Sequence, residues 1–141
     1  MGRSNLDADD LREAGAVPVV DQVLYHLQER AIEHAVLPWC EQRDIAVVAY
    51  SPFGHGQFPS EKTKGGRVLK QIADAHGATL RQVALRFLLR HPSVFAIPKS
   101  TTPDHMRENA AAGDLELSES EMTQIDRAFP LGPKPRELPM I

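Results

Sequence analysis

Cysteine is almost absent from this sequence of 141 residues, in which Cys40 is the only one. An intrachain disulfide and a metal cage built from cysteines are therefore excluded. A large excess of one charge is also lacking, because 16 basic residues stand against 19 acidic ones and give a net charge of −3. That balance does not favour nucleic acid as a partner. The content of 42% hydrophobic and 25% charged residues is typical of one soluble globular domain.

Long hydrophobic runs are missing as well. The longest are segments such as 45–50, whereas a membrane-spanning helix needs about twenty apolar residues. The first residues also lack the apolar stretch of a secretory signal peptide. We therefore expect a cytoplasmic protein with no membrane partner.

Strand-like and helix-like segments alternate along the chain. Residues 17–25, 45–50 and 94–97 are rich in apolar and β-branched residues, and the last two segments show no polar–apolar alternation. Such continuous runs are typical of parallel strands that are buried on both faces. The order of the segments predicts the α/β class, with a parallel sheet and outer helices.

Several helix ends are marked by capping residues. Thr79 with Gln82, and Ser118 with Glu121, form the pattern of a capping box at the start of a helix. Gly77 is placed to end the helix that precedes Thr79.

Two other helices are predicted from apolar stripes and prolines. Residues 32–40 form one stripe, in which Pro38 predicts a kink or an early stop. A second helix is expected to begin at Thr102 and Pro103 and to stop at Gly113.

Two segments show neither a helical nor a strand pattern. Residues 51–66 are rich in glycine, serine and proline and are predicted to form one long loop. Residues 130–141 are rich in proline and are predicted to form an extended tail, so that residues 1–129 make up the folded unit. A (β/α)₈ barrel needs at least about 200 residues, so the chain has the pattern of part of a larger fold.

The sequence gives little support for a catalytic nucleophile or a metal site. Six histidines are present, but none forms the His-Glu-x-x-His pattern of a zinc site. We therefore expect scattered surface histidines and no metal. Cys40 lies on an apolar stripe beside Trp39, so it is expected to fill the core rather than to act as a nucleophile.

Two loops after predicted strands have the composition of anion sites. Residues 51–56 form a glycine-rich turn that could expose backbone N–H groups, although an ordinary loop explains it equally well. Residues 97–103 combine Lys99, the hydroxyls of Ser100 and Thr101, and a helix N-terminus. This second loop favours a phosphate, with a simple capped loop as the alternative.

Four motifs in consistent order resemble those of the aldo-keto reductases, which are (β/α)₈ barrels that use NADPH. Residues 2–6 (Gly-Arg-Ser-Asn-Leu) are similar to Gly-Val-Ser-Asn-Phe, and residues 21–26 (Asp-Gln-Val-Leu-Tyr-His) to Asn-Gln-Val-Glu-Tyr-His. Residues 49–54 (Ala-Tyr-Ser-Pro-Phe-Gly) resemble Ala-Tyr-Ser-Pro-Leu-Gly. Residues 97–100 are the family's Ile-Pro-Lys-Ser, and residues 108–109 complete that motif.

The resemblance implies a binding site for a nicotinamide cofactor. The residues that would hold the nicotinamide carboxamide are Ser4, Asn5 and Gln22, and the one that would stack on its ring is Tyr50. Ser51 and Phe53 would line the pyrophosphate path. Lys99, Ser100 and Thr101 would contact the phosphates on the adenosine side. His105 would lie at the 2′-phosphate, and Asn109 would contact the adenine.

The sequence also departs from the family pattern. The catalytic Asp, Tyr, Lys and His of the family belong to the N-terminal half of the barrel, so the resemblance implies no catalytic residue in this chain. Asp21 stands where the family usually has Asn, and His105 stands where most members have Arg. NADPH is the expected cofactor, with NADH as a second candidate.

These observations together predict a half-barrel of three or four parallel strands with outer helices. The first hypothesis is the NADP(H)-binding half of an oxidoreductase that reduces aldehydes or ketones; whether this chain alone is an enzyme stays open. The alternative is an inactive truncated half-barrel that self-associates or complements a separate N-terminal half.

Overall fold

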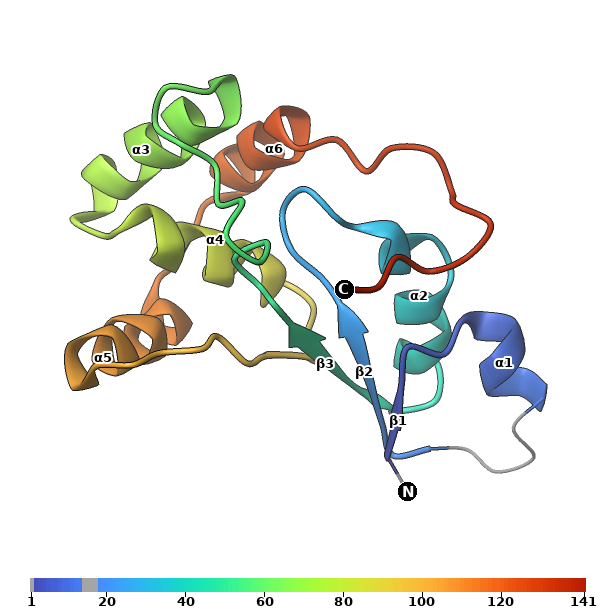
Figure 1. Cartoon of the computed structure of the whole chain (residues 1–141). Coiled ribbons are helices and arrows are strands. Elements are labelled where there is room, and N and C mark those ends of the chain that lie inside the picture. Colours follow the sequence, from blue (N-terminus) through green and yellow to red (C-terminus); the bar gives the residue numbers. More distant parts are fainter. Residues whose placement is uncertain (1, 14–17) are drawn as a thin grey trace.

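The computed structural model describes residues 2–13 and 18–141, which form a parallel sheet with surrounding helices (Figure 1). The strands are β1 (Gly2–Ser4), β2 (Val20–Leu24), β3 (Ala46–Tyr50) and β4 (Val94–Ala96). The helices are α1 (Ala8–Glu13), α2 (Val36–Glu41), α3 (Lys64–His76), α4 (Leu80–Leu88), α5 (Pro103–Ala111) and α6 (Glu119–Ala128). Short 3₁₀ turns η1 (Ala31–His34) and η2 (Ala112–Asp114) complete the described elements.

The four strands are all parallel and follow one another in chain order, β1-β2-β3-β4. The predicted α/β class and partial barrel are confirmed. Each of the strands β2, β3 and β4 is shorter than the apolar segment that predicted it; β2, for example, occupies only part of residues 17–25. Val17, the first residue of that segment, lies outside the described residues.

The helix boundaries follow the predicted caps closely. Both capping boxes are present, with the side chain of Thr79 accepting from the N–H of Gln82 and Ser118 accepting from that of Glu121. Gly77 ends α3 in the left-handed conformation, at φ 59°. These ends form where the sequence predicts them because each depends only on residues three or four positions apart.

The stripe over residues 32–40 is not one helix. It divides at Ala35, where φ is −148°, into η1 and α2. Pro38 lies in the first turn of α2, where its missing N–H costs no helical hydrogen bond. The break therefore lies before the proline rather than at it.

The predicted loop 51–66 ends three residues early, because α3 begins at Lys64. Thr63 caps this helix by accepting a hydrogen bond from the N–H of Gly66 at 3.0 Å. A Cβ on Gly66 would lie 1.9 Å from the Ser60 carbonyl oxygen, and one on Gly65 would lie 2.4 Å from the Phe129 ring. The two glycines thus allow the first turn of α3 to pack closely against Ser60 and Phe129, and they do not form a turn of the loop.

Helix α1 has no counterpart among the predicted elements. Its first turn is capped by Asp7, whose Oδ1 accepts from the N–H groups of Asp9 and Asp10 at 2.8 and 2.9 Å. An aspartate at the N-cap was the available signal.

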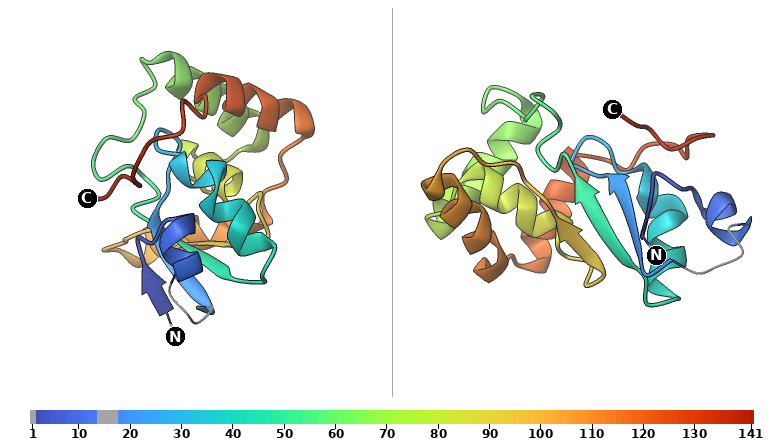
Figure 2. Two further views of the ribbon diagram at one scale, coloured as in Figure 1. Left: turned by 90° about the vertical axis from the view of Figure 1, so that its right-hand side faces the viewer. Right: turned by 60° about the horizontal axis from the view of Figure 1, so that its bottom comes forward.

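The tail over residues 130–141 forms no helix or strand and runs from α6 towards α1 and α2 (Figures 1 and 2). His34 Nε2 lies 3.1 Å from the Gly132 carbonyl oxygen, and Leu138 packs against the core. Its separation from residues 1–129 as a distinct unit stays a prediction.

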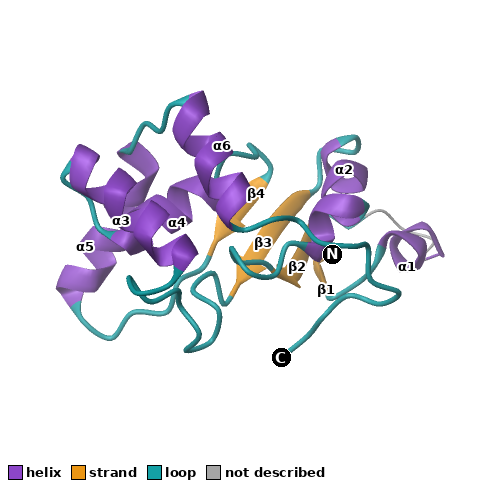
Figure 3. Cartoon of the chain, turned by 90° about the horizontal axis from the view of Figure 1, so that it is seen from above, coloured by secondary structure: helices purple, strands orange, loops and turns teal. Residues whose placement is uncertain are grey.

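The two faces of the sheet have different surroundings. One face packs against helices, and its side chains, including Val23, Val47, Ala49 and Val94, are buried. No described helix covers the opposite face (Figure 3). On that face Ser4, Gln22, Val48 and Phe95 lie side by side in register across the four strands, and Phe95 is 57% exposed.

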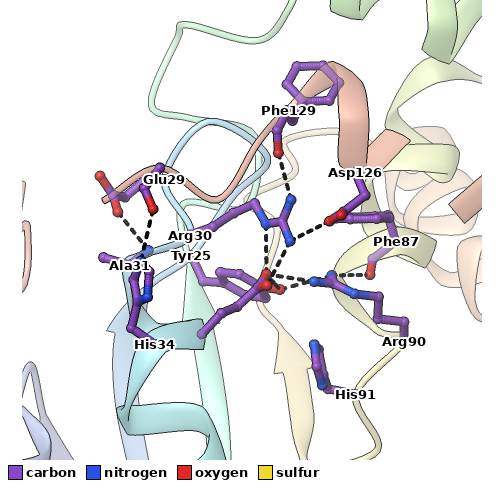
Figure 4. A network of polar contacts seen from close by, with 12 residues as sticks. Tyr25, Glu29, Arg30, Ala31, His34, Phe87, Arg90, His91, Asp126 and Phe129 are labelled. Carbon is purple, nitrogen blue, oxygen red and sulfur yellow. Dashed lines mark hydrogen bonds and ion pairs between the residues drawn. The ribbon is translucent and has the colours of Figure 1, made fainter. Parts of the chain in front are cut away.

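A network of charged side chains, centred on buried Arg30 and partly buried Glu33, joins the end of β2 to η1, α6 and the segment after α4 (Figure 4). The Glu33 carboxylate accepts from Arg30 at 2.9 and 2.7 Å, from the Tyr25 hydroxyl at 2.5 Å and from Arg90 at 2.6 Å. Arg30, only 4% exposed, also pairs with Asp126 at 2.7 Å and donates to the Phe129 carbonyl at 2.6 Å. Burial raises the pKa of Glu33, but the hydrogen bonds from Arg30, Tyr25 and Arg90 outweigh it and hold that pKa at about 2.

Removing the Glu33 charge is expected to destabilise the fold strongly. Glu33→Gln leaves the buried guanidinium of Arg30 and the half-buried one of Arg90 without their shared charged partner, and breaking a buried ion pair typically costs about 3–5 kcal/mol. Glu41→Gln is the matched control, because the exposed Glu41 carboxylate contacts only His91 at 3.2 Å and the Ser93 hydroxyl at 3.4 Å, and exposed pairs of this kind contribute about 0–1 kcal/mol. Urea denaturation at pH 7 measures both variants, and equal small losses would contradict the role given to Glu33.

Acid should remove the same stabilisation. The folded-state pKa of Glu33 lies below its ordinary value of 4.5, so its contribution is complete above that value and is lost as the pH falls towards 2. Glu33→Gln should flatten this part of the stability–pH curve.

Asp21 is the opposite case of a buried carboxylate. It is fully buried on the helix-covered face of β2, and neither of its oxygens has a hydrogen-bond partner among the described residues. Burial raises its pKa to about 6. The nearby backbone N–H groups of Leu6 and Gln22 oppose this rise, but neither meets the carboxylate in standard hydrogen-bond geometry.

We expect Asp21→Asn to stabilise the protein at pH 7. The folded state binds the Asp21 proton more tightly than the unfolded chain does, so ionised Asp21 costs stability as the pH rises from about 4 to 6. The substitution should remove about 1–3 kcal/mol of that cost and abolish its pH dependence. Urea denaturation at pH 4.5 and 7 tests this, with exposed Asp114→Asn as the control; a destabilised variant at pH 7 would refute it.

Candidate functional site

The carboxyl ends of parallel strands meet at one edge of a sheet, where loops can combine their side chains into a site. In this chain the residues after β1, β3 and β4 include most of the candidates named from the sequence. The structure arranges these candidates in two groups, one on the uncovered sheet face and one in a cavity beside α4 and α5.

The first group lies on the uncovered face, where β1, β2 and β3 end. Ser4 and Gln22 are exposed neighbours in register, and the Ser4 hydroxyl donates to the Gln22 carbonyl at 3.2 Å. Asn5 follows directly in the left-handed conformation at φ 55°. Tyr50 ends β3 opposite Leu24 on the same face, and its ring is half-buried.

The loop after β3 begins with an unusual backbone. Ser51 has φ 50° and His55 has φ 48°, in a region that non-glycine residues seldom adopt. The Gly54 N–H donates to the Ser51 carbonyl at 2.9 Å and closes the turn. This turn leads the chain away from Tyr50 and carries Phe53 towards α4.

The second group surrounds a cavity of about 110 Å³ lined by Phe53, Arg81, Lys99, His105, Glu108 and Asn109. Four of these six residues, namely Phe53, Lys99, His105 and Asn109, are candidates named from the sequence, each for a different part of the cofactor. Glu108 fixes α5 against α4, because its carboxylate accepts from the Thr79 hydroxyl at 2.7 Å and its carbonyl accepts from Gln82 at 3.0 Å. Larger hollows lie elsewhere, such as one of about 510 Å³ at the amino ends of β3 and β4, but they contain no predicted site residue.

The start of α5 offers fewer backbone donors than the sequence predicts. Pro103 has no N–H, and the N–H of His105 already donates to the Thr102 hydroxyl at 3.3 Å. The Ser100 hydroxyl donates to the Thr102 carbonyl at 3.0 Å. Any anion bound here must therefore depend mainly on side chains, above all on the cations.

Not every candidate lines the cavity. Ser51, Ser100 and Thr101 lie in the connecting loops and are absent from its lining. Arg81 also lines the cavity but is not among the candidates named from the sequence. Its position outside the apolar stripe of α4 indicates only that it faces outwards. Its nearness to Lys99 depends on how α4 and α5 pack, which the sequence pattern does not reveal.

The structure supports neither a nucleophile nor a metal site among the described residues. Cys40 is fully buried in the core, and burial raises the pKa of its thiol to about 12. Among residues 2–13 and 18–141, no three His, Cys, Asp or Glu side chains gather as a metal site would require. The described helices are all too short or too polar to span a membrane.

The sequence is similar to that of a known family over most of its length. The model of the aldo/keto reductase family matches residues 1–129. Methylglyoxal reductase YeaE of Escherichia coli is 40% identical over 134 residues, which cover 92% of this chain and 47% of that protein. Glyoxal reductase of Bacillus subtilis is 36% identical and is matched over 45% of its length. The chain thus spans about half the length of the curated relatives it matches.

Solved structures give the same result. An aldo-keto reductase from Klebsiella pneumoniae, solved in complex with NADPH, superposes with a TM-score of 0.88 at 38% identity. The match covers 99% of this chain and 51% of that one.

Proposed function

The chain belongs to the aldo-keto reductase family, and from this premise we propose that it is the NADP(H)-binding half of an oxidoreductase that reduces aldehydes or ketones. The observation that carries the proposal is the cavity that brings Phe53, Lys99, His105 and Asn109 together. The complex of the Klebsiella relative with NADPH supports the choice of cofactor. NADH is the second candidate, and a cytoplasmic location is part of the proposal.

The residues present fit such a cofactor at both of its ends. The cationic cavity suits a phosphate, because Lys99 and Arg81 both line it. The exposed hydroxyl of Ser4 and the exposed amide of Gln22 suit a carboxamide, which both donates and accepts hydrogen bonds. The flat, half-buried ring of Tyr50 suits stacking.

Each residue then has a binding role. Ser4, Asn5 and Gln22 hold the carboxamide, Tyr50 packs against the nicotinamide ring, and Ser51 with Phe53 lines the pyrophosphate path. The adenosine-side phosphates are held by Lys99, Ser100 and Thr101, with His105 at the 2′-phosphate and Asn109 at the adenine. The chemistry that a bound NADPH supplies is a hydride for the carbonyl carbon of the substrate.

Neither of the two tyrosines is placed to donate a proton to the carbonyl oxygen. The Tyr25 hydroxyl is buried and donates to Glu33 at 2.5 Å, and burial raises its pKa. The Tyr50 hydroxyl is buried without a hydrogen-bond partner among the described residues, so no neighbouring group there can resupply its proton. A missing general acid typically costs about 10²–10⁴-fold in rate.

We expect cofactor binding without turnover. NADPH at a hundredfold excess over its Kd should stabilise the chain by about 2.7 kcal/mol and raise its melting temperature. Methylglyoxal and other simple aldehydes should not be reduced by the purified chain. Turnover that disappears in Tyr50→Phe would contradict the missing acid, and an unchanged melting temperature would contradict the cofactor site.

The second candidate is a half-barrel that functions through association. Val19, Phe95 and Ile97 are 67%, 57% and 49% exposed, and β1 and β4 are open edges of the described sheet. Exposed apolar side chains and unpaired strand edges favour pairing with another chain. A second copy or a separate N-terminal half would cover the same surface.

Light scattering tests this association. We expect a mass above the 15.6 kDa of one chain, and Phe95→Glu should shift it towards the monomer, because a charge on the uncovered face opposes its burial. Met106→Glu is the matched control, since Met106 is equally exposed, at 62%, but lies on α5. A stable monomer of the unchanged chain would contradict self-association.

A further inference from the structure

Arg81 on α4 lines the same cavity as Lys99, although the two residues come from segments on opposite sides of β4 in the sequence. Glu108 is the only acid among the six lining residues. Its carboxylate already accepts a hydrogen bond from Thr79. Two permanent cations therefore face one small cavity, which suits an anion with more than one negative charge.

The guanidinium of Arg81 is held in place by aromatic rings. It lies 5.4 Å from the centroid of Phe53 and 5.7 Å from that of Phe58. The two rings meet edge to face at 5.7 Å. Such cation–π contacts occupy the face of the guanidinium and leave its N–H edge free.

That free edge distinguishes Arg81 from the arginines that build the fold. Arg30 and Arg90 use their N–H groups on Glu33 and on backbone carbonyls. In the described part of the chain, the side chain of Arg81 makes no hydrogen bond or ion pair with another residue. An oriented guanidinium with unused donors is suited to bidentate binding of a phosphate.

We propose that Arg81 is a specificity-determining residue that binds the 2′-phosphate of NADPH together with Lys99. This inference rests on the proposed cofactor role and extends it to a residue outside the loop after β4. The imidazole of His105 offers a phosphate one donor when neutral, whereas the guanidinium of Arg81 supplies a paired, charged contact. NADH lacks this phosphate, so Arg81 contributes to the choice between the two cofactors.

Calorimetric titrations of NADPH, NADH and adenosine 2′,5′-bisphosphate test the proposal. Arg81→Gln should weaken NADPH and the bisphosphate by about 10- to 100-fold, the usual loss for a charged hydrogen bond, and change NADH less than about 2-fold. Arg81→Lys keeps the charge without the planar fork and should fall between the two. Arg127→Gln, on the exposed face of α6, is the control and should alter none of the affinities.

The outcomes separate this inference from the proposed function. If Arg81→Gln weakens the affinities for NADPH and NADH equally, Arg81 supports only the loop or the adenine, and the assignment is overturned. An unchanged affinity for NADPH would also overturn it. If the bisphosphate binds through Arg81 but neither whole cofactor binds, the phosphate site is supported and the cofactor role fails. If none of the three compounds binds the unchanged chain, both are overturned.

Discussion

The carboxylate of Glu33 is the point at which the separate parts of this half-barrel are joined. It lies in η1, yet its hydrogen-bond donors come from the end of β2 through Tyr25 and from the segment after α4 through Arg90. Arg30 carries the connection on to α6 through Asp126. A buried ion pair of this kind contributes less to net stability than its number of contacts suggests, because its charges lose their hydration. Here it ties the end of α4 to η1 through Arg90, and the other end of α4 carries Arg81, which lines the cavity together with residues of α5.

The proposed cofactor binding and the proposed association would share the uncovered face of the sheet. Gln22 and Phe95 lie in one row across the sheet, separated only by Val48 on β3. A partner that buries Phe95 therefore lies next to the amide that faces the proposed nicotinamide end. In a closed barrel this face is the packed interior. The described strands thus have one face buried under helices and one face that no described helix covers, and the burial of the first face supports the four short strands.

Local signals in the sequence predict the helix ends well and the long-range polar contacts poorly. The boxes at Thr79 and Ser118 follow from residues three positions apart, and the loop after β4 already contains Lys99. Glu33 and Asp21 show the limit of this approach. Both are acids next to apolar segments, yet one receives hydrogen bonds from three side chains and the other from none. Only the packing of distant elements decides which of them is stabilised as an anion, and the same holds for the meeting of Arg81 with Lys99.

Anion binding at this site, as proposed, depends on side chains more than on the backbone. Thr102 and Pro103 make a stable start for α5, but in doing so they use or remove the N–H groups that a helix N-terminus would offer a phosphate. Long, flexible side chains must then supply the charge, and flexible cations lose entropy when they bind. The rings of Phe53 and Phe58 reduce that loss by holding Arg81 in advance. Because Phe53 is carried there by the turn that begins at Ser51, with its φ of 50°, the backbone of the loop after β3 is coupled directly to the anion cavity beside α4.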